Sequence, residues 1–357
     1  MSRCSFVHGV AASIGWHECA ASLTDLIFRA TTAALADANV DIAQVDSVVL
    51  SAHDLVDGRS LSSMVTAPAA GAYLRDEIRL AEDGLAAMSL ASARIEAGET
   101  EFSIVAAWGR ASEGTYSHTS RFAADPFLVQ PFGVNEFAIS SLRLSEWVGE
   151  YGDHLDARQR AQTARTQRAA RNPRAISSVT RPTVSYPMIS SEAPRFADIV
   201  VVAVIGASES AIRIAGVGHS TEVANIGERR LSRMHALQDA VLRARAVDGS
   251  SSERLDVVEL AGPCLTDEAI AVEAIQMASA GEGFEAYASL LCINPSGGSE
   301  RGWCFPASGL LNFSECYLQL AGRAGGVQVS GTPRRALATG LSPMGGQVAH
   351  AIILAAA

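Results

Sequence analysis

The sequence contains no lysine, so all 28 basic side chains among its 357 residues are arginine. Catalysis through a Schiff base between a lysine and a carbonyl substrate is therefore excluded. Hydrophobic residues make up 48% of the chain and charged residues only 18%. A chain of this length and composition can bury a large core, and we expect a globular α/β protein with two lobes or one broad unit.

Long hydrophobic runs are also absent. The apolar stretch 197–207 is long enough for a buried strand, but a membrane-spanning helix needs about 20 such residues. The first ten residues lack the basic and apolar regions of a signal peptide. We therefore expect no membrane attachment and a cytoplasmic location.

Residues that could hold a metal ion are few and scattered. The six cysteines show no CxxC or Cys/His spacing, and the eight histidines show no HxH or HExxH pattern. We expect no metal site and interpret the cysteines as mainly small buried thiols, because a chain of this size needs no disulfides. His118 is the histidine to consider for a functional role, since it lies at the edge of a segment that could cover a pocket.

The net charge is unevenly distributed along the chain. A formal charge of −10 disfavours nucleic-acid binding, which needs a basic surface. Residues 158–174 reverse this charge, because they carry six arginines and no acidic residue. Two interpretations stay open: a solvated helix face, or a cradle in which Arg165 and Arg168 bind an anionic group.

Buried strands and amphipathic helices are expected to alternate along the chain, in an order that returns after a middle segment. The chain therefore reads as two related halves. The expected strands are 6–11, 47–51, 102–108, a strand near 197–207, 212–218, 257–260, 336–339 and 348–354, and the expected helices are 21–39, 84–97, 135–151, 231–247, 267–279 and 309–322.

Three short motifs carry most of the information in this sequence. They are the glycine-rich segment 294–298 with 306–309, the turn 81–87 before a helix of small residues, and the tail 343–347. Small residues let a helix pack closely, so we expect the helix from Gly84 to lie at the centre of the protein. Glycines allow close approach of backbone amides to a bound group. The residues expected to line a ligand pocket are Asn294, Gly297, Gly298, Gly345 and Gly346.

Through these motifs the chain resembles the thiolase superfamily, and within it the sterol-carrier-protein-like thiolases and thiolase-like aldolases. The resemblance covers nearly the whole chain and implies a five-layered α/β/α/β/α fold. The implied parts are an N-terminal half, 1–115, completed by the strand near 197–207, a loop domain, 116–195, that covers the pocket, and a C-terminal half, 196–357. It also implies a coenzyme A thioester as ligand, whose phosphates the arginines would hold, no permanently bound cofactor, and a dimer.

The residues that carry out thiolase chemistry are replaced in this sequence. Aligned to the family pattern, the nucleophilic cysteine falls on Ala81, the histidine of the Gly-His-Pro motif on Trp303, and the second cysteine on Ser342. An alanine cannot accept an acyl chain, and an indole cannot exchange a proton. Glu82 and Asp83 lie in the same turn as Ala81, and we interpret them as helix-capping residues.

Other residues could have taken over a catalytic role. Cys304 and Cys264 lie beside altered motif positions and are candidates for a relocated nucleophile, although buried cysteines are usually packing residues. Tyr317 and Tyr186 are candidates for a proton donor in a retro-aldol reaction.

Three functions remain open. The first is a non-catalytic subunit that pairs with an active thiolase-fold homologue in an acyltransferase or condensing complex. The second is a thiolase-like aldolase that cleaves a 3-hydroxyacyl-CoA together with a small accessory protein of the zinc-ribbon/OB type. The third is a module that binds acyl-CoA without turnover. Each agrees with a homo- or hetero-oligomer.

Overall fold

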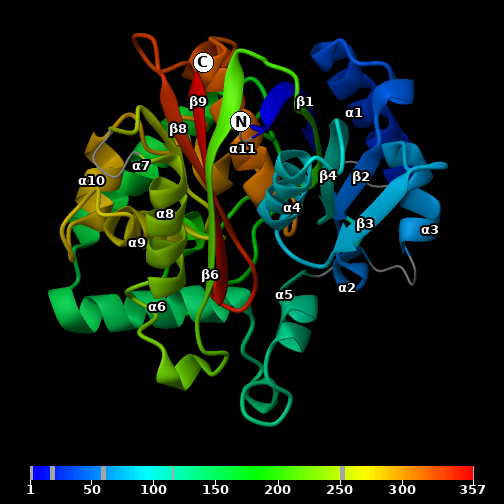
Figure 1. Cartoon of the computed structure of the whole chain (residues 1–357). Coiled ribbons are helices and arrows are strands. Elements are labelled where there is room, and N and C mark those ends of the chain that lie inside the picture. Colours follow the sequence, from blue (N-terminus) through cyan, green and yellow to red (C-terminus); the bar gives the residue numbers. More distant parts are fainter. Residues whose placement is uncertain (1–2, 17–20, 58–61, 115, 250–253, 357) are drawn as a thin grey trace.

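The computed structural model describes residues 3–16, 21–57, 62–114, 116–249 and 254–356. No helix in this described part of the chain is both long and apolar enough to cross a membrane. Two groups of strands form the framework (Figure 1). They are β1 (Phe6–Gly15), β2 (Ser47–Ser51), β3 (Asp76–Leu80), β4 (Phe102–Arg110) and β5 (Asp198–Gly206) in the first group, and β6 (Ile212–Thr221), β7 (Val257–Glu259), β8 (Arg335–Leu341) and β9 (Val348–Ala356) in the second.

The two groups repeat one pairing pattern, in the overall order β3-β2-β4-β5-β1-β6-β9-β8-β7. In the first, β1, β5 and β4 are antiparallel neighbours, and β4, β2 and β3 are parallel. In the second, β6, β9 and β8 are antiparallel, and β8 and β7 are parallel. A parallel bridge from Ile293 to Val258 takes the place of a fifth strand. The prediction of two related halves is therefore confirmed.

The helices are arranged in layers around these two groups. Helix α1 (Leu23–Ala38) packs on β1 and β5, and α8 (His235–Asp248) packs on β6 and β9. Helices α4 (Gly84–Ala97) and α11 (Ser308–Leu320) lie near the middle of the molecule (Figure 1) and contact each other. They share one hydrophobic core with strands of both groups. The result is the expected α/β/α/β/α arrangement.

Small side chains place α4 at this centre, as the sequence predicted. A Cβ atom added to Gly84 would lie 2.6 Å from the Leu310 Cβ and 3.0 Å from the Ala107 Cβ. Only a glycine therefore fits where α4 begins between α11 and β4. This close approach brings the amino-terminal ends of α4 and α11 together, and that junction forms the site described below.

The segment 116–195 lies between β4 and β5 in the chain. It contains α5 (Tyr116–Thr119), α6 (Glu136–Tyr151) and α7 (Leu155–Arg171). The Asn135 side chain caps α6 by accepting a hydrogen bond from the Ala138 amide at 2.9 Å. Helix α7 packs against α9 (Leu265–Ala274) and α10 (Gly283–Ser289), so the segment is anchored mainly on the second half. The remaining short helices are α2 (Asp54–Asp57) and α3 (Ser62–Thr66).

Some expected boundaries differ from those observed. The helix expected over 231–247 begins at His235, because Met234 adopts a left-handed conformation with φ of 47°. The helix expected over 267–279 occupies 265–274, and Gln276, with φ of 64°, prevents its continuation. Strand β3 was not predicted, since its charged residues Asp76 and Glu77 are exposed at the sheet edge.

Candidate functional site

A small pocket lies where the carboxyl ends of β7 and β8 meet the beginnings of α4 and α11. Ligand sites in α/β proteins commonly occupy this edge of a sheet. The space open to the centre of a water molecule is about 10 Å³, which is room for about one water. The residues that form its wall are Asp83, Tyr116, Glu136, Ala261, Gly262, Pro263, Trp303, Phe305, Ser308, Leu341 and Pro343.

Asp83 lies between the amino-terminal ends of two helices. It caps α4, where its Oδ1 accepts a hydrogen bond from the Leu85 amide at 3.0 Å, and its Oδ2 accepts one from the Gly309 amide of α11 at 3.0 Å. Burial raises the pKa of the Asp83 carboxyl to about 7, although the two amide hydrogen bonds lower it. The carboxyl therefore exchanges its proton near neutral pH.

Two glycines make room for this carboxyl group. A Cβ atom added to Gly309 would lie 1.8 Å from Asp83 Oδ1, and one added to Gly340 would lie 2.1 Å from the same atom. Gly309 belongs to the Pro306-Ala307-Ser308-Gly309 motif and Gly340 to β8. The glycine-rich motif thus accommodates an acidic side chain.

Glu136 is the first residue of α6 and is 5% exposed. Its Oε1 accepts a hydrogen bond from the Gly345 amide at 2.9 Å, whereas its buried Oε2 has no hydrogen-bond partner among the described residues. Burial, followed by the negative charge of Asp267, raises the pKa of Glu136 to about 7, and Arg143 and Arg229 oppose this rise. Glu136 is thus a second carboxyl that titrates near neutral pH.

Tyr116 begins α5 and lines the same pocket. Its ring packs edge-on against Trp303, with ring centres 5.0 Å apart. Burial, then the charges of Glu136, Cys304 and Asp83, raise the pKa of Tyr116 well above its usual value. The phenol therefore stays protonated at neutral pH and can act as a hydrogen-bond donor.

Trp303 lies in the pocket wall, at the position expected for the family's histidine. Its indole packs against Tyr116, Phe137 and Phe196, with ring centres 5.0 to 6.1 Å apart. An aromatic cluster of this kind fills space and excludes water. It accounts for the small volume of the pocket.

The other two altered motif positions lie close to Asp83 but outside the pocket wall. Ala81 is exposed, and Asp83, two residues later, is the member of this turn that lines the pocket. Ser342 is buried; its Oγ accepts a hydrogen bond from the Asp83 amide at 3.3 Å and contacts the Glu82 carboxylate. Ser342 thus holds the turn that presents Asp83.

The sequence candidates for a relocated catalytic group do not line this pocket. The Cys304 thiol packs against Gly109, where an added Cβ would lie 2.5 Å from Sγ. Burial raises the pKa of Cys264 well above its usual value, so that thiol stays protonated. Tyr317, near the end of α11, donates a hydrogen bond to the His8 carbonyl at 3.3 Å, and His118 and Tyr186 are exposed. Cys19 lies outside the described residues.

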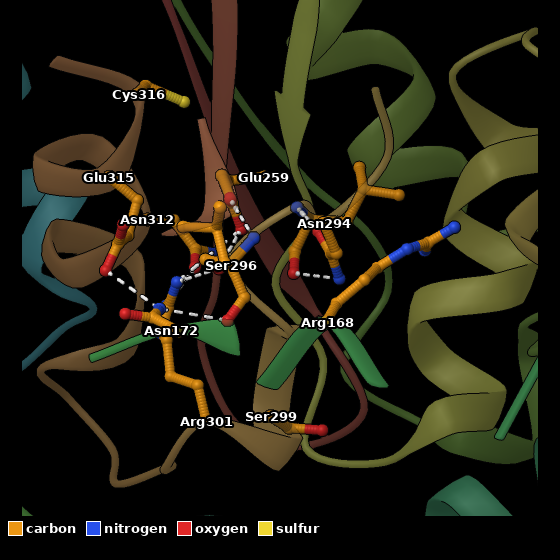
Figure 2. Close-up of polar contacts among 12 residues, drawn as sticks. Arg168, Asn172, Glu259, Asn294, Ser296, Ser299, Arg301, Asn312, Glu315 and Cys316 are labelled. Carbon is orange, nitrogen blue, oxygen red and sulfur yellow. Dashed lines mark hydrogen bonds and ion pairs between the residues drawn. The ribbon is translucent and has the colours of Figure 1, made fainter. Parts of the chain in front are cut away.

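The segment 294–298 is packed into the interior and does not supply amides to the pocket. Glu259 accepts hydrogen bonds from the Ser296 amide and hydroxyl at 3.1 and 2.7 Å. The Asn294 Oδ1 accepts one from the Leu260 amide at 2.6 Å, and Arg301 reaches Ser296 and Asn312, as Figure 2 shows. The expected pocket floor is therefore a buried polar network that fixes this segment.

The two glycines of this segment serve close packing. A Cβ atom at Gly297 would lie 2.5 Å from the Ala169 Cα of α7, and one at Gly298 would lie 2.5 Å from a Glu268 carboxylate oxygen. Both residues have positive φ, at 101° and 54°. Gly345, in contrast, donates its amide to the pocket residue Glu136, and Gly346 beside it is buried.

Arg165 and Arg168, the arginines expected to form an anion cradle, are both buried. Arg165 is fully buried and lies 3.5 Å from Glu300, and its Nη1 donates to the Ser299 hydroxyl at 2.9 Å. Arg168 donates to the carbonyls of Ile293 and Tyr287, both at 2.9 Å. Both guanidinium groups bind other parts of the protein, because α7 packs against the segment 287–300.

The buried network predicts a measurable pH effect on stability. Burial raises the pKa of Glu259 to about 7, above its usual value of 4.5, although Arg301 opposes this. Because the folded state holds this proton more tightly, the stability that Glu259 contributes is fully present below pH 4.5 and is lost as the pH rises to 7, an effect on the order of 3 kcal/mol. We expect Glu259→Gln to flatten the fall in unfolding free energy between pH 5 and 8. Urea titrations at each pH check this, with the exposed Glu77→Gln as control; an unchanged slope would contradict it.

Three residues of the pocket escaped the sequence reasoning. Asp83 was interpreted only as a capping residue, and capping is indeed one of its two roles. Tyr116 and Glu136 stand at the two ends of a segment without a motif. The helix cap Asn135 did indicate that Glu136 begins a helix. Nothing in the sequence indicated that this end of the helix lies at the same pocket as Asp83.

Comparisons with known proteins place the fold. No protein-family model matches the chain, and no curated protein sequence matches it. The chain is structurally similar to an Ltp2–ChsH2(DUF35) aldolase, with a TM-score of 0.80 and 16% identity over 99% of this chain and 98% of that chain. It is also similar to an acetyl-CoA acetyltransferase from Syntrophomonas wolfei, with a TM-score of 0.71 and 16% identity over 99% of each chain.

A third similar structure is a monomeric SCP2-thiolase-like protein type 1 from Mycobacterium smegmatis, with a TM-score of 0.70 and 14% identity over 99% of this chain and 78% of that chain. At such identities the likeness concerns the fold. The repeated strand order, the two central helices and these three structures together show that the chain has the thiolase fold.

Proposed function

We propose that the protein is a carbon–carbon lyase that cleaves a 3-hydroxyacyl-CoA by a retro-aldol reaction. The observation that carries this proposal is the set of proton-transfer groups in one buried pocket: the carboxyls of Asp83 and Glu136, whose pKa values are raised to about 7, beside the protonated phenol of Tyr116. A retro-aldol cleavage needs proton transfer and no covalent intermediate. These groups suit that requirement.

The proposed reaction takes one proton from the C3 hydroxyl and delivers one to C2, and proton exchange with solvent then restores the starting forms of Glu136 and Asp83. Glu136, through its unpartnered Oε2, takes the proton from the C3 hydroxyl, and the C3–O bond becomes a carbonyl as the C2–C3 bond breaks. The electron pair of that bond passes to C2 and forms the thioester enolate, whose oxygen accepts a hydrogen bond from Tyr116. Asp83 in its protonated form then delivers a proton to C2. The products are a carbonyl compound and a shortened acyl-CoA.

The fold comparison supports an aldolase and a partner. One similar structure is described as an Ltp2–ChsH2(DUF35) aldolase, whose two named components agree with the small accessory protein expected from the sequence. The proposed pocket holds about one water. We propose that the substrate enters when the aromatic side chains of the wall move, in the presence of the accessory protein.

The test is product formation from 3-hydroxyacyl-CoA thioesters, by the purified chain and by the complex isolated from its native host. We expect equal amounts of a carbonyl compound and a shortened acyl-CoA. Tyr116→Phe should slow cleavage about 10- to 100-fold through loss of the enolate's donor. Glu285→Gln, on the surface of α10, is the matched control and should leave the rate unchanged. Unreacted substrate with the isolated complex would refute the proposal.

The pocket also predicts a pH optimum. Below pH 7 Glu136 becomes protonated and cannot accept the hydroxyl proton, and above pH 7 Asp83 loses the proton that C2 must receive. We therefore expect a bell-shaped dependence of kcat/KM with its maximum near pH 7, falling about tenfold per pH unit on each side. Initial rates between pH 5 and 9 measure this. A flat profile would mean that other groups move the protons.

The non-catalytic partner remains the second candidate, and the small pocket favours it. A site with room for about one water suits a subunit whose partner performs the chemistry. In that case the complex isolated from the native host contains a cysteine-bearing thiolase-fold homologue. Its acyl-transfer activity would depend on that cysteine and would be unaffected by Asp83→Asn in this chain.

We further propose an oligomer formed through β3. This strand is at the edge of the first group of strands and is only half-buried, so one row of its backbone groups is available for pairing. A homologous β3 or a second copy could extend the sheet across a two-fold axis. Light scattering of the purified chain should give the mass of a dimer, whereas a monomer that persists in the isolated complex would contradict this arrangement.

A further inference from the structure

A second cleft lies on the second half of the protein, with a volume of about 540 Å³. Its wall is formed by the end of α7, the segment 289–292 with Pro295, residues 326–330, and Arg254 and Asp256. This volume is in the range of sites that hold small organic ligands. None of the pocket residues described above belongs to it.

The cleft lies at the beginning of β7 and β8, whereas the pocket that contains Asp83 lies where these strands end. Asp256 immediately precedes β7, and its carboxylate accepts hydrogen bonds from the Arg334 and Arg335 amides at 2.8 and 3.1 Å, where β8 begins. The pocket residues Ala261 and Gly262 follow the other end of β7. Strand β7, Val257–Glu259, lies between them, so the two sites are at its opposite ends. The two sites are therefore distinct.

Two arginines give the cleft an unusual charge. Most arginines in the described part of the chain bind carboxylates or carbonyls, as Arg168 does in the same wall. The side chains of Arg171 and Arg254 are exposed and have no hydrogen bond or ion pair with any described residue. The carboxylate of Asp256 is already bound to two backbone amides. Two guanidinium groups are thus available to a ligand.

Apolar side chains complete the wall. Leu290, Leu291, Val327 and Val329 line the cleft together with Pro295. A guanidinium group binds phosphate through two parallel hydrogen bonds, and an apolar surface favours a ring or acyl group. We propose that this cleft binds a phosphate ester of nucleotide size, with its phosphates on Arg171 and Arg254 and its ring on the apolar wall.

Calorimetric titration of the full chain tests the proposal with four probes: ATP, adenosine 3′,5′-bisphosphate, adenosine and inorganic phosphate. We expect a nucleotide to bind at least tenfold more tightly than adenosine or phosphate alone. Tighter binding of adenosine 3′,5′-bisphosphate than of ATP would identify the nucleotide part of coenzyme A as the natural ligand. Equal binding of ATP would identify nucleotides in general as ligands, and both outcomes support the site.

Variants assign the binding to this cleft. Arg171→Ala and Arg254→Ala should each weaken nucleotide binding at least about tenfold, because each removes a charge-assisted pair of hydrogen bonds. Both side chains are exposed, so the variants should fold. Arg29→Ala, an exposed arginine on α1, is the matched control. Unchanged affinity in both cleft variants, or no nucleotide binding at millimolar concentration, would overturn the proposal. Binding that persists in Asp83→Asn keeps this test separate from that of the catalytic pocket.

Discussion

An Asp83→Asn variant is expected to reduce kcat/KM for cleavage of a 3-hydroxyacyl-CoA by about 10²–10⁴-fold, because the amide cannot deliver a proton to C2. The substitution keeps the size and shape of the side chain but places an NH2 group opposite one of the two backbone amides that Asp83 binds. Asparagine caps helices as well as aspartate does, and its oxygen can still accept the Leu85 or Gly309 amide hydrogen bond. The variant should therefore remain folded, because the new side chain has the size of the carboxyl group that fits between Gly309 and Gly340.

Steady-state rates with the isolated complex measure this loss, and circular dichroism confirms the fold. Glu285→Gln is again the control for removal of one negative charge, since Glu285 is on the surface and pairs with Arg160. If the Asp83→Asn variant cleaved the substrate as fast as the unchanged protein, the proton at C2 would come from another group. The role assigned to Asp83 would then be wrong.

An Arg165→Ala variant is expected to lower the free energy of unfolding by about 3–5 kcal/mol. Arg165 is fully buried and joins α7 to Ser299, to the Ser191 carbonyl and to Glu300. Its removal takes the donor from the Ser299 hydroxyl and the Ser191 carbonyl, leaves Glu300 with only Arg181 and Arg195, and creates a cavity beneath α7. The effect would be on stability, whereas an arginine that held a coenzyme A phosphate would affect mainly ligand affinity.

Urea or thermal unfolding measures this change. Arg160→Ala is a matched control on the same helix, because Arg160 is 55% exposed and forms a surface ion pair with Glu285. Such pairs contribute about 1 kcal/mol or less. A variant of Arg165 as stable as that of Arg160 would show that the buried arginine does not hold α7 in place.

The sequence predicted the layers of this fold because hydrophobic periodicity reports burial directly. Helix α4 and strand β2 were predicted with the observed boundaries, since each is apolar on the faces that the core covers. Strand β3 was not predicted because it lies at a sheet edge. Its residues Asp76 and Glu77 are exposed and give no hydrophobic pattern. Its partner β2 determines its conformation.

The site was less predictable because its groups come from distant parts of the chain. The alignment of motifs correctly indicated that Trp303 lies in the pocket wall. It assigned the nucleophile's position to Ala81, which is exposed, whereas Asp83 lines the pocket. Tyr116 and Glu136 reach the pocket only through the path of the segment 116–195. The sequence showed the positive charge of residues 158–174. It did not show which carboxylates and carbonyls, such as the carboxylate of Glu300, these arginines contact in the folded protein.

Proton exchange at C2 of a short acyl-CoA in D₂O, followed by mass spectrometry, shows directly whether this pocket transfers protons to and from a thioester. This half-reaction requires only the groups that move the proton and needs no carbonyl co-substrate. We expect the native complex to incorporate deuterium at C2 and the Asp83→Asn variant not to do so. Absence of deuterium with the native complex between pH 6 and 8 would contradict the claim that this pocket performs acid–base chemistry on a thioester.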